Sequence, residues 1–440
     1  MKLDRRLLLS SLALSGALAA CSGVGGSLPG AQNGASPSLR ERANASTSTT
    51  LSFVNKTATA NKDIWFCYYG LDPVKGTPLY LADAKGTLTK SVPASKPTTS
   101  LCVNVASAKS FVFPELNAAR LYVSYGKPLA FAVGGNARPI PPSPANPKDP
   151  NYGTKWDFFE LSYIPEAGAT SGRFNFNLSV LQSANLNMQF AVSGLIPGTT
   201  TPKSYTRGWN PGGYAAFVKS VKANKDFAGL VLAGTNRVLA PGTAIQAYVQ
   251  NLIPAPIFSS TYYKQYVAKS WTKYQTDTLT FIGDPPIGSQ KKVTWTGQVV
   301  KGQFVFTPPS GNTLGLIPMV WNQPSSADIF ENNFLFCVSG CGKSHAQQAN
   351  YANQIFGTLM GVYNRSVMLT ETTFTNDPFG AWCTNQSTWY QDPTTNVYSQ
   401  FIHANSIKGL AYAFQSDDHC DVSSFVAVWN PTNFTITFQN

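Results

Sequence analysis

The chain has 440 residues, of which 43% are hydrophobic and only 12% are charged, and its formal net charge is +12. This balance excludes an intrinsically disordered chain, and the lack of charged heptads excludes a coiled coil. The basic residues are scattered, and the sequence has no RNA-reading motif or zinc-finger spacing, so no nucleic-acid partner is predicted. The 35 glycines and 30 prolines are typical of many strands joined by turns.

The first 20 residues have the pattern of a signal peptide. A basic start precedes the apolar stretch Leu7–Ala20, which is shorter than the roughly 20 residues that span a bilayer. Leu18-Ala19-Ala20-Cys21 is similar to a bacterial lipobox, which predicts removal of residues 1–20 and lipidation of Cys21. An ordinary signal peptide with a chance cysteine is the alternative. The sequence thus predicts an exported bacterial lipoprotein, held at the cell envelope by its lipid alone, or a secreted protein.

Residues 21–50 are rich in Gly, Ser, Ala and Thr without periodicity, which predicts a flexible tether. Strand patterns follow, and the proline-rich residues 139–150 are predicted to be a connecting segment that runs over the surface. The segments Asp157–Ile164 and Arg173–Leu181 are predicted to form a hairpin, and the second of them alternates apolar and polar residues. The earlier predicted strands are Leu51–Asn55, Asp63–Tyr69, Arg120–Tyr125 and Leu129–Val133.

Helical periodicity begins after Gly212, where apolar residues recur at i, i+3, i+4 and i+7. A second helix is predicted after Ser260 as its N-cap, with Tyr263, Tyr266, Val267, Trp271 and Tyr274 along it. Further predicted elements are strands over Lys292–Thr307 that turn at Lys301-Gly302, helices over His345–Arg365 and Asn396–Asn405, and strands over Phe425–Asn440 joined at Asn430-Pro431-Thr432. We expect a β-rich domain from residues 51–200 with 321–440, an inserted mixed α/β domain at 201–320, and a wide cleft between them.

The cysteines fit an exported chain. Once Cys21 carries lipid, six remain, and an even number suggests disulfides with fifteen possible connectivities. Proximity in sequence favours the pairs Cys67–Cys102, Cys337–Cys341 and Cys383–Cys420. No metal site is predicted, because no second Cys or His pair completes a zinc set with Cys337 and Cys341.

Two familiar motifs are incomplete. Gly342-Lys343-Ser344 matches the end of a P-loop, but Cys337 stands where its first glycine is required, so a disulfide turn is the better interpretation. There is no G-x-S-x-G elbow, and His403 falls on a predicted helix, where we expect a structural hydrogen bond. No cofactor is predicted.

Glu160 is the strongest candidate for a catalytic group. It lies in Trp156-Asp157-Phe158-Phe159-Glu160-Leu161, where neighbouring rings would desolvate its carboxyl group. Desolvation raises the pKa of a carboxyl group and keeps it protonated, as a general acid requires. The alternative is an outward-facing glutamate with no function.

The same residues resemble the glycoside hydrolase family 64 β-1,3-glucanases. Asp149-Pro150-Asn151-Tyr152 followed by the Glu160 segment is similar to the family's stretch before its acid, and Asn177–Gln182 is similar to its N-x-S-x-V-D strand. Weaker similarity continues over about residues 50–440, in Arg237–Pro241, Trp271 with its preceding tyrosines, Pro324–Phe330, Asn396–His403 and Tyr412–Asp418.

This resemblance implies a thaumatin-like β-sandwich or barrel with an inserted α/β domain, and an inverting hydrolase of β-1,3-glucan. An inverting site holds two carboxyl groups about 6.5–9.5 Å apart, an acid and a base with water between them. By the family pattern Glu160 is the acid and the base is the strand aspartate, but here that position is Gln182. An amide can orient a water but cannot take its proton.

Three explanations of Gln182 stay open: a shifted alignment, a substitute carboxylate such as Glu166, or hydrolysis lost with glucan binding kept. The expected substrate contacts are the rings of Trp156, Phe158 and Tyr398 and the polar groups of Asn177, Ser179, Asp417 and Asp418, with core packing as the alternative for each ring. Asp417-Asp418 lacks the alternating oxygen ligands of a calcium loop. We predict a monomeric β-1,3-glucan hydrolase, with a non-hydrolytic glucan-binding protein as the second hypothesis and a protein-binding surface protein as the third.

Overall fold

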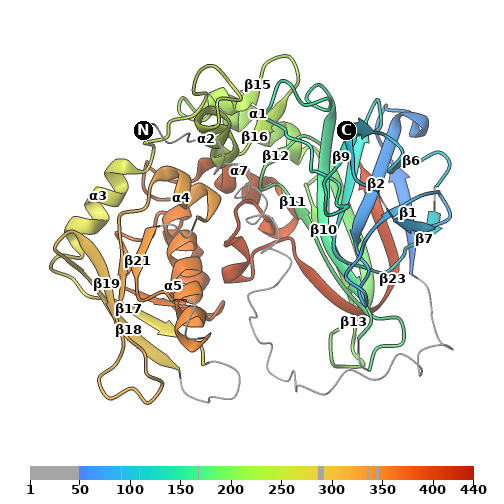
Figure 1. The fold of residues 1–440 in the computed structure, drawn as a ribbon. Coiled ribbons are helices and arrows are strands. Elements are labelled where there is room, and N and C mark those ends of the chain that lie inside the picture. Colours follow the sequence, from blue (N-terminus) through green and yellow to red (C-terminus); the bar gives the residue numbers. More distant parts are fainter. Residues whose placement is uncertain are drawn as a thin grey trace, which may run out of the picture.

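The computed structural model describes residues 49–440 except Ser91, Lys109, Ala167, 286–291, 334–335 and 343–345. The predicted signal peptide, the lipid site Cys21, His345 and most of the P-loop-like tail therefore lie outside the described residues. Within them, strands predominate over helices, and the two largest sheets lie in different parts of the molecule (Figure 1). This confirms the β-rich class with a mixed α/β part.

The larger sheet has twelve strands among the described residues. Its main order is β14-β13-β23-β11-β10-β8-β2-β3-β4, and β1, β6 and β7 pair beside this path. The strands are β1 (Thr50–Asn55), β2 (Ile64–Leu71), β3 (Pro78–Leu81), β4 (Leu88–Lys90), β6 (Cys102–Asn104), β7 (Ser110–Val112), β8 (Leu116–Tyr125), β10 (Lys155–Ile164), β11 (Arg173–Ser179), β13 (Met188–Leu195), β14 (Pro202–Gly208) and β23 (Val426–Phe438).

The predicted hairpin is confirmed as β10 and β11, which pair antiparallel from Phe158 with Ser179 to Ile164 with Arg173. The alternate residues Phe174 and Phe176 of β11 both face the hydrophobic core and are fully buried. β9 (Phe131–Val133) pairs with β5 (Ala94–Thr98) in a separate ribbon.

The C-terminal segment is one irregular strand rather than the predicted pair. β23 runs between β11 and β13 and also pairs in parallel with β1. Asn430 and Asn433 take positive φ values of 51° and 50°, and the pairing with β13 shifts register in this region. The predicted turn therefore redirects the strand without reversing it.

The second large sheet has six strands among the described residues, in the order β21-β20-β19-β18-β17-β22. They are β17 (Leu279–Gly283), β18 (Val293–Val300), β19 (Gln303–Thr307), β20 (Met319–Trp321), β21 (Cys337–Ser339) and β22 (Thr373–Thr375). The predicted turn at Lys301-Gly302 is confirmed between β18 and β19. The predicted division placed residues 321–440 with the larger sheet, but among the described strands of that range only β23 joins it, and β21 and β22 pair in the second sheet.

Helices pack on the second sheet and between the two parts of the molecule (Figure 1). They are α1 (Gly213–Ala223), α2 (Pro241–Val249), α3 (Lys264–Lys273), α4 (Ser326–Glu331), α5 (Ala346–Asn364), α6 (Ala381–Thr384) and α7 (Val397–Asn405). The predicted helices at α1, α3, α5 and α7 are confirmed. The predicted cap is wrong, because α3 begins at Lys264 after Tyr263 and has no side-chain cap. β12 (Ser183–Ala184), β15 (Val231–Leu232) and β16 (Arg237–Leu239) form a small sheet between the parts.

The three favoured disulfides are all formed, linking Cys67 to Cys102, Cys337 to Cys341 and Cys383 to Cys420. The first joins β2 to β6, and the third joins α6 to the turn after Asp417. Within the described part of the chain, no helix combines the length and the apolar character needed to cross a membrane.

Candidate active site

Glu160 lies in a row of side chains that crosses four adjacent strands. Tyr69 on β2 is opposite Arg120 on β8, Arg120 is opposite Glu160 on β10, and Glu160 is opposite Asn177 on β11. Directly opposed residues of antiparallel strands project to the same face of a sheet. The pairing therefore collects a phenol, a guanidinium, a carboxyl group and an amide on one face.

The Glu160 carboxyl group is only half paired. The side chain is 5% exposed, and Oε1 lies 3.3 Å from Arg120 Nη2. Its other oxygen, Oε2, is buried without a hydrogen bond to any described residue. Burial raises the pKa of Glu160, and the Arg120 guanidinium opposes this shift. Glu160 is thus a protonatable group with one oxygen left over, which is what proton donation requires.

Aromatic rings support this ion pair from one side. The Arg120 guanidinium lies 4.9 Å from the centre of the Phe158 ring, which stacks on Tyr122. Trp156 is fully buried and Phe158 is 3% exposed, in a cluster that also holds the Cys67 side chain. These two rings were predicted to stack on sugar, but in this structure a ligand cannot reach their faces. They form the base on which Arg120 and Glu160 are held.

Asn177 and Ser179 lie on β11, and their side chains project to the same face of the sheet as Glu160. Asn177 is 8% exposed, and its Oδ1 has no hydrogen bond to a described residue. Ser179 is fully buried between its partner Phe158 and a bridge to Tyr412. The sequence placed both in the site, and the structure brings both beside Glu160.

β11 ends at Ser179, and Gln182 follows shortly after it in the chain. Its backbone carbonyl accepts a hydrogen bond of 3.0 Å from Ala240 N, at the start of α2. The side-chain Oε1 is buried without a partner among the described residues. The pairing of β10 with β11 therefore does not extend to Gln182. That position 182 is the site of the base stays a prediction.

Asp157 is a structural residue that sequence reasoning did not single out. Successive side chains of a strand alternate, so it faces away from Glu160. Its Oδ2 accepts hydrogen bonds from Asn185 N at 2.9 Å and Leu186 N at 2.7 Å. Burial raises its pKa to about 8, which these backbone N–H donors oppose. Asp157 thus holds the segment after Gln182 against β10.

Asp417 belongs to a buried ion-pair network. Its Oδ1 lies 2.8 Å from Arg365 Nη2, and His403 Nε2 lies 3.0 Å from both of its oxygens. Ala413 N donates to Oδ2 at 2.8 Å, so both oxygens have partners and the side chain is 0% exposed. The structural hydrogen bond predicted for His403 is confirmed. Asp417 is not available to a ligand in this structure, whereas its neighbour Asp418 is exposed.

Tyr398 is also a structural residue here. It is fully buried on α7, and its hydroxyl donates a hydrogen bond of 2.7 Å to Val180 O. This bond clamps the chain just after β11, so the ring is not free to stack on a sugar.

Glu166 lies beyond the other end of the hairpin. β10 ends at Ile164, about 13 Å along the strand from Glu160, and Glu166 follows it. Its carboxylate forms an ion pair of 3.2 Å with Arg173. Glu166 is therefore poorly placed to replace a base at position 182.

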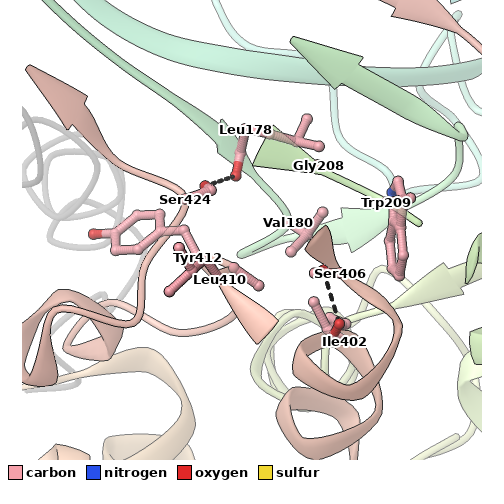
Figure 2. Close-up of a pocket in the computed structure, with 10 residues that line it drawn as sticks. Leu178, Val180, Gly208, Trp209, Ile402, Ser406, Leu410, Tyr412 and Ser424 are labelled. Carbon is pink, nitrogen blue, oxygen red and sulfur yellow. Dashed lines mark hydrogen bonds between the residues drawn. The ribbon is translucent and has the colours of Figure 1, made fainter. Parts of the chain in front are cut away.

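A small cavity lies behind the end of β11 (Figure 2). Leu178 and Val180 line it, and alternation places them on the face opposite Asn177 and Ser179. Ser424 Oγ closes one side by donating to Leu178 O at 2.9 Å. The cavity has room for about one water molecule and is therefore too small for a sugar ring. The other lining residues are Gly208, Trp209, Ile402, Ser406, Leu410, Ala411 and Tyr412.

No group of His, Cys, Asp and Glu among the described residues is arranged to hold a metal ion. A buried acid with a free oxygen supplies one of the two carboxyl groups that a glycoside-hydrolase site uses. The model of glycoside hydrolase family 64, described as beta-1,3-glucanase, matches residues 47–438. The chain belongs to this family.

Two curated relatives are similar to the chain. Both are named glucan endo-1,3-beta-glucosidase, one from Cellulosimicrobium cellulans and one from Arthrobacter sp. (strain YCWD3). Each is 25% identical over 320 residues, which is 71% of this chain and 50% of the relative. The chain thus spans about half the length of the curated relatives it matches.

Solved structures share the fold. A laminaripentaose-producing beta-1,3-glucanase in complex with laminaritetraose has a TM-score of 0.70 at 21% identity, covering 89% of this chain and 98% of that one. A beta-1,3-glucanase domain from Clostridium beijerinckii has a TM-score of 0.67 at 22% identity, with the same coverage of both chains.

Proposed function

We propose that the protein hydrolyses β-1,3-glucan with inversion, and that Glu160 is the general acid. The observation that carries the proposal is the buried Glu160 carboxyl group, whose Oε2 has no partner among the described residues. Burial favours its protonated form, and Asn177 beside it offers an amide to sugar hydroxyls.

The relatives support the substrate. One of the similar structures holds laminaritetraose, and the curated relatives are named for cleavage of 1,3-β-glucan. We extend this substrate class to the present chain because the family match includes the whole of β10 and β11.

The base is the open part of the mechanism. On the described residues of β10 and β11, the side chains that share Glu160's face include no second carboxylate: they are Trp156, Phe158, Ser162, Ile164, Arg173, Asn175, Asn177 and Ser179. Gln182 orients a water without accepting its proton. This favours a second candidate function, in which the protein binds β-1,3-glucan without hydrolysing it.

We further propose that the protein acts outside the cytosol as a monomer, tethered through lipid on Cys21. Three disulfides at the predicted pairs support an oxidising compartment.

The test is reducing-sugar release from laminarin by the purified protein, with Glu160→Gln as the control. Release that disappears in the control supports the hydrolase. Laminarin binding without release supports the second candidate, and neither binding nor release refutes both.

A further inference from the structure

We propose that Phe425 and Trp429 on the β23 side of Glu160's face form the platform on which glucosyl units stack. This inference rests on the proposed function and names the residues that select its substrate. The rings expected to stack from the sequence, Trp156, Phe158 and Tyr398, are all buried. The stacking surface must therefore come from another element.

Strand pairing places β23 next to β11 on the side away from Glu160. Phe176 is opposite Val426, and Arg173 is opposite Trp429. Phe425 directly precedes Val426, so continued extended chain brings it beside Asn177. The row of Tyr69, Arg120, Glu160 and Asn177 thus points to Phe425, the residue directly before β23.

Burial fixes which way these side chains point. Val426 and Val428 are 1% and 0% exposed and lie in the core, whereas Phe425 is 47% exposed. Because side chains alternate along a strand, Phe425, Ala427 and Trp429 share the opposite face, which is also the face of Arg173, Asn175 and Asn177.

Trp429 has a polar group to offer as well as a ring. It is partly exposed, and its Nε1 is buried without a hydrogen bond to a described residue. Gly168 lies beside the ring, where an added Cβ would be 3.5 Å from Trp429 Cζ3. Ala427 lies between Phe425 and Trp429 along the chain, so the residues next to these rings are small.

The chemistry fits a neutral sugar. A pyranose presents apolar C–H faces to an aromatic ring and hydroxyl groups at its rim. Phe425 supplies the ring, and Asn177 Oδ1 and Glu160 Oε2 are buried polar atoms without described partners in the same row. An aromatic ring flanked by hydrogen-bonding groups is a typical way to fix the orientation of a ligand.

The experiment measures laminarin affinity by calorimetry in the Glu160→Gln background, where no substrate is consumed. Phe425→Ala and Trp429→Ala should each weaken binding about tenfold, and Phe425→Tyr should keep it within about threefold. Phe379→Ala is the matched control, because Phe379 is 75% exposed and lies outside the large sheet, and its affinity should not change. Near-ultraviolet circular dichroism checks that each variant is folded.

The outcomes separate the two proposals. Unchanged affinity in both folded alanine variants, with a parent that binds laminarin, overturns the platform and leaves the proposed function standing. A parent that does not bind laminarin refutes the proposed function and the platform with it.

Discussion

Glu160 and Asp417 are both buried acids, but their surroundings differ in how completely they are paired. Asp417 contacts Arg365, His403 and the Ala413 N–H, and both of its oxygens are used. Glu160 has an ion pair of 3.3 Å with Arg120, and its Oε2 has no hydrogen bond within the usual distance to a described residue. A fully paired carboxylate holds structure together, whereas a half-paired one keeps bonding capacity for a ligand. This difference separates two residues that the sequence analysis had both assigned to the site.

The largest expected effect comes from adding the missing base at position 182. Gln182→Asp introduces a carboxylate where the family has its base, so laminarin hydrolysis should rise by about 10²–10⁴-fold. Gln182→Asn is the matched control, since it has the same shape without the charge. Reducing-sugar assays check this, and equal rates in the two variants would show that position 182 does not carry the base.

Breaking the fully paired site should cost stability instead. Asp417→Ala leaves the buried Arg365 without its counter-charge, and we expect a loss of about 3–5 kcal/mol in the free energy of unfolding. Asp226 gives the control, because it is exposed and Asp226→Ala should change stability by less than about 0.5 kcal/mol. Urea denaturation measures both. An Asp417→Ala variant that is as stable as the parent but has lost laminarin affinity would restore Asp417 as a substrate contact.

Changing the charged partner of Glu160 should shift a pH profile. Arg120→Met removes the cation that lowers the Glu160 pKa, so that pKa rises further. The acid then stays protonated to higher pH, and the high-pH limb of kcat/KM should move upward. Arg173→Met, on the same face but paired with Glu166, should leave the limb in place. A downward shift in Arg120→Met would contradict the assignment of Glu160 as the acid.

The smallest effect is expected at His419, a half-buried residue. Burial lowers the pKa of His419 to about 4 from its ordinary 6.5, and His419 Nε2 lies 2.8 Å from Thr358 Oγ1. The unfolded chain therefore binds more protons between these values, and the protein loses stability as the pH falls from about 6.5 to 4. His419→Gln should reduce this loss by about 1–2 kcal/mol. Denaturation at pH 7 and pH 4.5 checks it, and an identical pH dependence would contradict it.

Local patterns predicted much of this fold. Alternation gave the hairpin of β10 and β11, and sequence proximity gave the three disulfides, because both depend on near neighbours. α4 was missed although its signal was visible: Ser325 and Asp328 form a capping box. Asp157 was missed because its partners Asn185 and Leu186 lie beyond the hairpin, and no local pattern shows such contacts.

The candidate site was predicted less completely than the fold. Aromatic residues near Glu160 in sequence looked like ligand contacts, but Trp156 and Phe158 pack under it. Phe425 was not considered, because only the pairing of β23 with β11 brings it near. Distance along the sequence therefore did not predict that Phe425 lies near the acid. It also did not predict that Trp156 and Phe158 are buried.

The position of β23 also sets an order of assembly. β23 lies between β11 and β13, which precede it in the chain by more than 200 residues (Figure 1). Until β23 pairs with them, each of these two strands has an unpaired edge. Open strand edges recruit other chains, and pairings this distant in sequence form slowly. The same delay makes the newly synthesised chain most vulnerable to aggregation just before β23 docks.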